Sequence, residues 1–210
     1  MSGPARADEV RAPRYALWAG ARASWLAFAY RFYDAPNGQA ETTGQWVKDG
    51  IAPELDLGAR LSRRYVPYVF WEHGFMARGR RFEGSVATLA TNFFGGGVRY
   101  LPGDVDGLSP VIDLAIGKRS LRASSGGDTF TMSGVEFFRL GLGAELRLAS
   151  HATGSVLVSF ATGELSETDG TLLFPRGDAK APPYAKGARI DLQRAYVAAT
   201  LGGAVHFDLF

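Results

Sequence analysis

The chain has no cysteine among its 210 residues, which excludes a disulfide framework and a thiol nucleophile. No stretch approaches the roughly 18 continuous apolar residues of a membrane-spanning helix. An excess of charge of one sign is also missing, because 23 basic residues stand against 21 acidic ones and no basic run occurs. The sequence therefore gives no reason to expect a nucleic acid partner.

What the sequence does contain is strict alternation, most clearly in residues 136–149, EFFRLGLGAELRLA. Successive side chains of a β-strand point to opposite faces, so this pattern predicts a strand with one apolar and one polar face. The strand is long enough to cross a bilayer, which takes roughly 9–11 tilted residues. The apolar row is Phe138, Leu140, Leu142, Ala144, Leu146 and Leu148, and the opposite row is Phe137, Arg139, Gly141, Gly143, Glu145 and Arg147.

The same alternation predicts an all-β fold, an eight-stranded antiparallel up-and-down transmembrane β-barrel. An even number of strands closes the sheet and leaves no edge exposed to lipid. We expect one barrel domain over residues 14–210, preceded by a tail or signal-peptide remnant over residues 1–13, where Ala5-Arg6-Ala7 resembles a cleavage site. The predicted strands cover residues 15–30, 54–62, 66–77, 85–101, 110–122, 136–149, 155–166 and 190–210. Longer connections are predicted at 31–52, 78–84, 123–134 and 167–188.

Strand parity assigns a facing to each side chain. Eight strands enclose a lumen just wide enough for side chains, so charges that face inward should pair in a structural network that blocks flow. The predicted lumenal charges are Arg22, Asp56, Arg60, Glu72, Arg99, Asp113, Arg139, Glu145 and Arg147. The predicted lipid-facing residues are Leu55, Leu57, Leu61, Ile112, Leu114, Ile116, Leu140, Leu142, Leu146 and Leu148.

The chain end, GGAVHFDLF at 202–210, closes on a β-patterned segment with a terminal phenylalanine. With LDLGARLSRRYVPYVFWEHGF (55–75), GGGVRYL (95–101) and LGLGAELRL (140–148), the chain resembles the small outer-membrane β-barrel superfamily, which includes the membrane domain of outer membrane protein A. The resemblance implies location in the outer membrane of a Gram-negative bacterium, with outer-membrane lipids as partners. It also implies contact with the barrel assembly machinery during biogenesis, through a signal made of Val205, Phe207, Leu209 and Phe210. Phe210 breaks the parity of the other three, and a bulge at Gly202-Gly203 could reset the register.

These expectations favour a membrane scaffold or surface interaction module with a plugged polar lumen, and the surface partner stays unidentified. Two alternatives remain open: an outer-membrane channel for small or hydrophobic compounds, of the outer membrane protein W kind, and a soluble lipocalin-like barrel that binds its ligand inside. The loops at 31–52 and 167–188 are the predicted recognition elements. Their candidate residues are Trp46, Lys48, Lys180, Tyr184 and Lys186.

An enzymatic reading rests on few residues. Outer-membrane lipid A deacylases use a histidine, a serine and an acid near the outer rim, and this chain has three histidines in all. His73 lies beside Glu72, but the order His73-Gly74-Phe75 lacks the serine of the H-x-S spacing. His151 and His206 fall near the end expected to face the periplasm. No catalytic residue, cofactor or metal site is therefore predicted.

Overall fold

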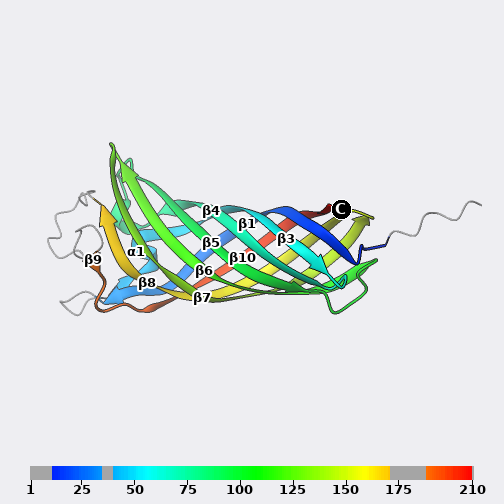
Figure 1. Cartoon of the computed structure of the whole chain (residues 1–210). Coiled ribbons are helices and arrows are strands. Elements are labelled where there is room, and N and C mark those ends of the chain that lie inside the picture. The colour runs from blue at the N-terminus through cyan, green and yellow to red at the C-terminus, as the bar shows by residue number, and fades with distance from the viewer. Residues whose placement is uncertain (1–10, 35–39, 171–187, 210) are drawn as a thin grey trace, which may run out of the picture.

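The computed structural model describes residues 11–34, 40–170 and 188–209, which form a closed antiparallel β-barrel (Figure 1). Each long strand pairs with the next, and the last pairs with both its predecessor and β1, so the described sheet closes into a ring. The predicted fold class is confirmed. Among the described residues, no helix is long and apolar enough to cross a membrane. The eight barrel strands are β1 (Tyr15–Asp34), β3 (Val47–Leu61), β4 (Tyr65–Arg78), β5 (Thr88–Tyr100), β6 (Leu108–Ser125), β7 (Asp128–Ala149), β8 (Ala152–Gly170) and β10 (Ala195–Leu209).

Four short elements gather at one end of the barrel, which we call the loop end (Figure 1). They are β2 (Ala40–Thr42), α1 (Thr43–Trp46), the 3-10 turn η1 (Arg80–Phe82) and β9 (Ala188–Arg189). The start of β1 and the end of β10 lie together at the opposite end, which we call the termini end.

The strand pairing fixes the tilt and size of the barrel. Paired residues can be followed from each strand to the next around the barrel, perpendicular to the strands. A path that starts at Tyr15 of β1 returns to β1 at Trp25, ten residues further along the chain. A shear of ten over eight strands corresponds to a tilt of about 40° and a backbone radius of about 8 Å. The path therefore climbs about 25 Å, the height of the apolar band of a transmembrane barrel. The residues between those two ends are Leu61, Tyr65, Tyr100, Ile112, Leu142, Val158 and Leu201.

The outer wall is apolar and the lumen is polar over most of its length. Leucines, valines, isoleucines and aromatic rings make up the exposed large side chains of every barrel strand, whereas arginines and carboxylates are buried inside. This facing is the reverse of a soluble ligand-binding barrel, which turns its apolar residues inward. A wall of this kind is stable when lipid covers it.

Two predicted loops are largely regular structure. The segment 31–52 contains the end of β1, then β2 and α1, and the start of β3. The segment 123–134 is a hairpin, because β6 runs to Ser125 and β7 starts at Asp128. Gly126 and Gly127 form its turn with φ of 59° and 96°, a conformation that glycine adopts without strain. Both segments escaped prediction because their strands extend past the apolar outer wall, where the apolar side chains, such as Phe130 and Met132, are buried inside and the outward residues are largely polar.

One predicted facing in β7 is wrong. Parity placed Phe137 on the lumenal side with Arg139, but Phe137 and Phe138 are both exposed on the outer wall. The pairing of β7 with β6 and β8 shifts register between Glu136 and Phe138, which marks a β-bulge. The extra residue reverses the parity, so even positions face inward before the bulge and odd positions after it. No bulge occurs at Gly202-Gly203, where the pairing of β10 is continuous.

Candidate functional site: the lumenal ion-pair network

The middle of the lumen holds a group of ion pairs that we call the central cluster. Arg119 of β6 contacts Glu72 of β4 at 3.0 Å and Glu136 of β7 at 2.5 Å. Arg139 of β7 contacts the same two glutamates at 3.0 Å each and reaches Glu54 of β3 at 3.4 Å. Glu72 and Glu136 each bridge the two arginines, and Glu54 accepts from Arg139 across the lumen. These pairs connect β7 with β3, which lies on the opposite side of the barrel. All five side chains are buried.

Aromatic rings complete the central cluster. The ring of Phe93 lies 4.5 Å from the guanidinium carbon of Arg119 and 4.3 Å from that of Arg139. Cations held against an aromatic face gain a further attraction, which is larger where water is excluded. The Tyr196 hydroxyl donates to Glu136 Oε2 at 3.1 Å. The cluster is therefore packed as well as paired, which leaves little room for water or ions between its members.

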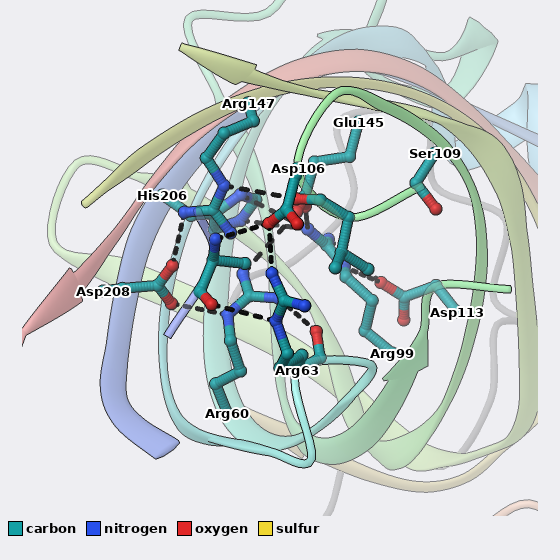
Figure 2. A network of polar contacts seen from close by, with 12 residues as sticks. Arg60, Arg63, Arg99, Asp106, Ser109, Asp113, Glu145, Arg147, His206 and Asp208 are labelled. Atoms are coloured by element: carbon teal, nitrogen blue, oxygen red, sulfur yellow. Dashed lines mark hydrogen bonds and ion pairs between the residues drawn. The ribbon is translucent and has the colours of Figure 1, made fainter. Parts of the chain in front are cut away.

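A second group, the termini-side cluster, fills the lumen nearer the chain ends, and Figure 2 shows its side chains converging from different walls of the barrel. Asp208 accepts from Arg60 Nε and Arg147 Nη1, both at 2.7 Å. Glu145 lies 3.6 Å from Arg60 and 3.3 Å from Arg99, and Arg99 also pairs with Asp113 at 3.1 Å. The members are Arg60, Arg99, Arg147, Asp113, Glu145 and Asp208.

Arg22 of β1 links the two clusters. Its guanidinium lies 3.4 Å from Glu54 of the central cluster and 3.5 Å from Asp113 of the termini-side cluster. The buried lumenal charges then number six arginines and seven carboxylates. This near balance lets each charge be compensated inside the protein, as a buried ion pair requires.

His206 lies in the termini-side half of the lumen, stacked on Trp18 with ring centroids 4.2 Å apart. Its Nε2 is 3.2 Å from Asp56 Oδ2, and its Nδ1 is 3.3 Å from Arg99 Nη1. The same Arg99 nitrogen also lies 3.4 Å from Nε2. These contacts connect Asp56 to the network through the imidazole ring.

A clasp outside the membrane-spanning segments covers the termini end. Arg63 in the β3–β4 turn pairs with Asp106 in the β5–β6 loop and donates to the Ala12 carbonyl at 3.0 Å. The Ala12 N–H donates to Asp106 at 2.7 Å. Burial alone would raise the pKa of Asp106, but the hydrogen bonds from Ala12 and Arg63 outweigh it and lower the pKa below the ordinary 3.8. Ser62 and Arg63 both adopt positive φ, 51° and 67°, so the turn carries a conformational cost that the clasp offsets.

The loop end is closed differently, by apolar packing. Trp46 of α1 is fully buried and lies 5.4 Å from the Phe130 ring and 6.1 Å from the Phe82 ring of η1. Arg81 pairs with Glu41 beside it. Below this cap, buried apolar side chains line the lumen as far as the central cluster. The prediction of Trp46 as a surface recognition residue is wrong, because its ring seals the barrel. Lys180, Tyr184 and Lys186 lie outside the described residues.

The structure brings the nine predicted lumenal charges together. All nine are buried, and every one joins the network through an ion pair or hydrogen bond. The predicted lipid-facing residues point outward, with Leu140 half-buried and the other nine exposed. Val205, Phe207 and Leu209 also point outward, and Phe210 lies outside the described residues. The network members that sequence reasoning missed are Glu54, Arg119, Glu136, His206 and Asp208.

The three histidines occupy unrelated places. His73 faces the outer wall, where its Nδ1 lies 2.8 Å from Asn92 Oδ1, whereas Glu72 points into the lumen. Its proximity to Glu72 in sequence therefore creates no dyad. His151 lies in the exposed β7–β8 turn. Within the described part of the chain, no group of three or more histidine and carboxylate side chains is arranged to hold a metal ion.

No family model matches this sequence. No curated protein matches it either. Solved structures do match: Neisserial surface protein A has 9% sequence identity and a TM-score of 0.60, with 92% of this chain and 97% of that chain covered. The outer membrane protein AlkL, solved in lipid bilayers, has 12% identity and a TM-score of 0.54, with 100% of this chain and 98% of that chain covered. At these identities the likeness describes the fold alone.

Proposed function

We propose that this chain is a small outer-membrane β-barrel protein of a Gram-negative bacterium and that it acts as a sealed membrane scaffold whose loop end serves as an interaction surface. The observation that carries the proposal is the ion-pair network, which spans the lumen from strand to strand. In a narrow low-dielectric lumen, paired charges are costly to separate, so the network resists opening.

The closure at each end supports the same function. The clasp of Arg63, Asp106 and Ala12 covers the termini end, and Trp46 with Phe82 covers the loop end. A conducting barrel needs a continuous aqueous path. Here ion pairs fill one part of the lumen and packed apolar side chains fill the part toward the loop end. A sealed barrel keeps the membrane intact while it holds surface elements in place.

The surface role draws on the β6–β7 hairpin. Beyond Ile116, the outward residues of β6 change from apolar to Lys118 and Arg122, while β6 and β7 continue to pair up to Ser125 and Asp128. This hairpin therefore projects from the wall as a rigid polar extension, visible at the loop end in Figure 1. Rigid scaffolds that display such extensions commonly carry recognition there.

Planar-bilayer recordings test the sealed lumen. We expect no steady single-channel current from the wild-type protein, and a measurable current from a Trp46→Ala/Glu72→Ala/Arg139→Ala variant, which removes the ring that closes the loop end and two members of the central cluster. A matched Glu167→Ala variant, changed at an exposed residue near the rim, should stay silent. Steady, ion-selective currents from the wild type would contradict the proposal.

A passage for small apolar compounds is the second candidate function. The apolar loop-end third of the lumen favours it, because Leu26, Phe130 and Met132 form an environment that such a compound could enter if Trp46 moved. Uptake of an apolar dye into proteoliposomes separates the two functions. The sealed scaffold predicts the same uptake with and without the protein, and a Trp46→Ala variant that raised uptake selectively would favour the passage.

A further inference from the structure

An open hollow of about 800 Å³ lies on the outer side of the loop end, between β1, β2 and the start of β10. It lies beside an irregular point in β1, where Tyr30 adopts a φ of 86° and its ring is exposed. That ring is 72% exposed, which is unusual for so large a side chain in a barrel strand. The lining residues are Tyr30, Arg31, Thr42, Thr43, Arg194 and Ala195.

Two arginines beside the hollow share one carboxylate. Arg194 contacts Asp34 at 2.6 Å and Arg31 contacts it at 3.6 Å, so one negative charge serves two positive ones. Both guanidiniums remain about half exposed, at 55% and 52%, whereas Asp34 is 18% exposed. Each guanidinium carries five N–H donors, more than the single carboxylate can engage. The hollow is thus lined by surplus positive charge and by accessible donors.

The hollow lies where the apolar wall ends. From Tyr15 to Ala29 the outward residues of β1 are all apolar or aromatic, and the same holds from Ala195 to Leu209 on β10. Apart from tyrosines, the ionisable residues in those spans are Arg22, His206 and Asp208, and all three point into the lumen. Going outward from the lipid-facing wall, the first outward charges are therefore Arg31 on β1 and Arg194, which directly precedes β10. Tyr30 lies at the same boundary, where tyrosine is favoured among lipid headgroups.

We propose that Arg31 and Arg194 bind the phosphate group of a phosphorylated lipid headgroup in the outer leaflet, with the Tyr30 ring against the lipid. A guanidinium matches phosphate through paired, charge-assisted hydrogen bonds, which makes arginine suited to this contact. Asp34 pairs with both arginines and therefore competes with the phosphate for them. The site rests on the outer-membrane premise but not on the sealed lumen, because none of its residues belongs to the network.

Binding of diphosphoryl lipid A, a phosphorylated glycolipid, to the protein in uncharged detergent tests the site by native mass spectrometry. We expect an Arg31→Gln/Arg194→Gln double variant to bind at least about tenfold more weakly, since one charged hydrogen bond is worth about that factor and the variant removes the charged donors of two side chains. An Arg14→Gln/Arg64→Gln variant removes two exposed cations at the termini end, the opposite end of the barrel, and should bind like the wild type. The fully dephosphorylated lipid should bind wild type and double variant alike.

The Asp34→Asn substitution should change the affinity for the phosphorylated lipid in the opposite direction. It removes the competing carboxylate and keeps the side chain, so the folded variant should bind the phosphorylated lipid more tightly than the wild type. Heat-dependent mobility on gels identifies the folded species in every sample, and currents in planar bilayers report the lumen separately.

Three results would overturn the site. One is an equal loss of binding in the Arg31/Arg194 and Arg14/Arg64 variants, which would mean general charge attraction. Another is full displacement of the lipid by inorganic phosphate, which would mean a free-phosphate site. The third is weaker binding by folded Asp34→Asn protein.

Discussion

Arginine in place of Leu142 tests whether the outer wall of β7 faces lipid. Leu142 is half exposed and lies five pairing steps along the path that climbs from Tyr15 to Trp25 in eight steps. Five eighths of a band about 25 Å tall is about 16 Å, a little past the midplane. Arginine near the midplane of a transmembrane barrel costs about 2–4 kcal/mol of folding free energy, so Leu142→Arg should lose about that much.

Leu61→Arg is the matched control. Leu61 also points outward but lies one step from Tyr15, about 3 Å from the edge of the band, where arginine costs about 0–1 kcal/mol. Reversible urea unfolding in lipid vesicles, followed by tryptophan fluorescence, gives both free energies. Equal costs at Leu142 and Leu61, or no cost at Leu142, would refute the assigned depth and facing.

Other substitutions test the lumen, the strand spacing and the clasp. Glu136→Gln should lower the free energy of unfolding by about 3–5 kcal/mol, because it leaves buried arginine charge uncompensated; a loss below about 1 kcal/mol would mean that water solvates the cluster. Gly143→Ala should block folding into vesicles, since its Cβ would meet the Val156 carbonyl oxygen at 1.9 Å, whereas Gly203→Ala has its nearest contact at 3.7 Å and should fold normally. Because the pKa of Asp106 is lowered in the folded state, its stabilisation is present above the ordinary aspartate pKa and disappears as pH falls through the folded value. The gap in unfolding free energy between wild type and Asp106→Asn should therefore shrink from pH 7 to pH 3, and a gap that widened would contradict the clasp.

Alternation predicted the barrel well where lipid lies on one side and the lumen on the other. In that zone each position has one of two environments, so apolar and polar residues must alternate, as they do through Leu55, Asp56 and Leu57. Beyond the apolar wall the outward side chains meet water and the inward ones are apolar and buried, so in the hairpin Leu121 and Met132 are buried while Arg122 is exposed. The facing of the apolar residues is thus inverted there, so a pattern of apolar outer and polar inner faces does not identify these strands.

The lumenal network was predictable in part. Glu54 and Arg119 lie within the predicted strands 54–62 and 110–122 and share parity with Asp56 and Asp113, so applying the alternation over the whole of each strand would have found them. Glu136 could not be found in this way, because the bulge at Phe137 reverses the facing of β7 before it. Bulges depend on how two strands pair, and a single strand pattern does not contain that information.

The absence of cysteine allows the most direct measurement, because a single introduced cysteine carries a fluorescent probe to one chosen position. On β8, Val156 and Val158 are exposed on the outer wall, while Ser155 and Ser159 are buried in the lumen. Brominated lipid chains in reconstituted vesicles should quench the probe strongly at positions 156 and 158 and leave it bright at positions 155 and 159. Quenching at the two serine positions, or none at the two valine positions, would contradict a barrel whose apolar wall faces lipid and whose charged lumen is sealed.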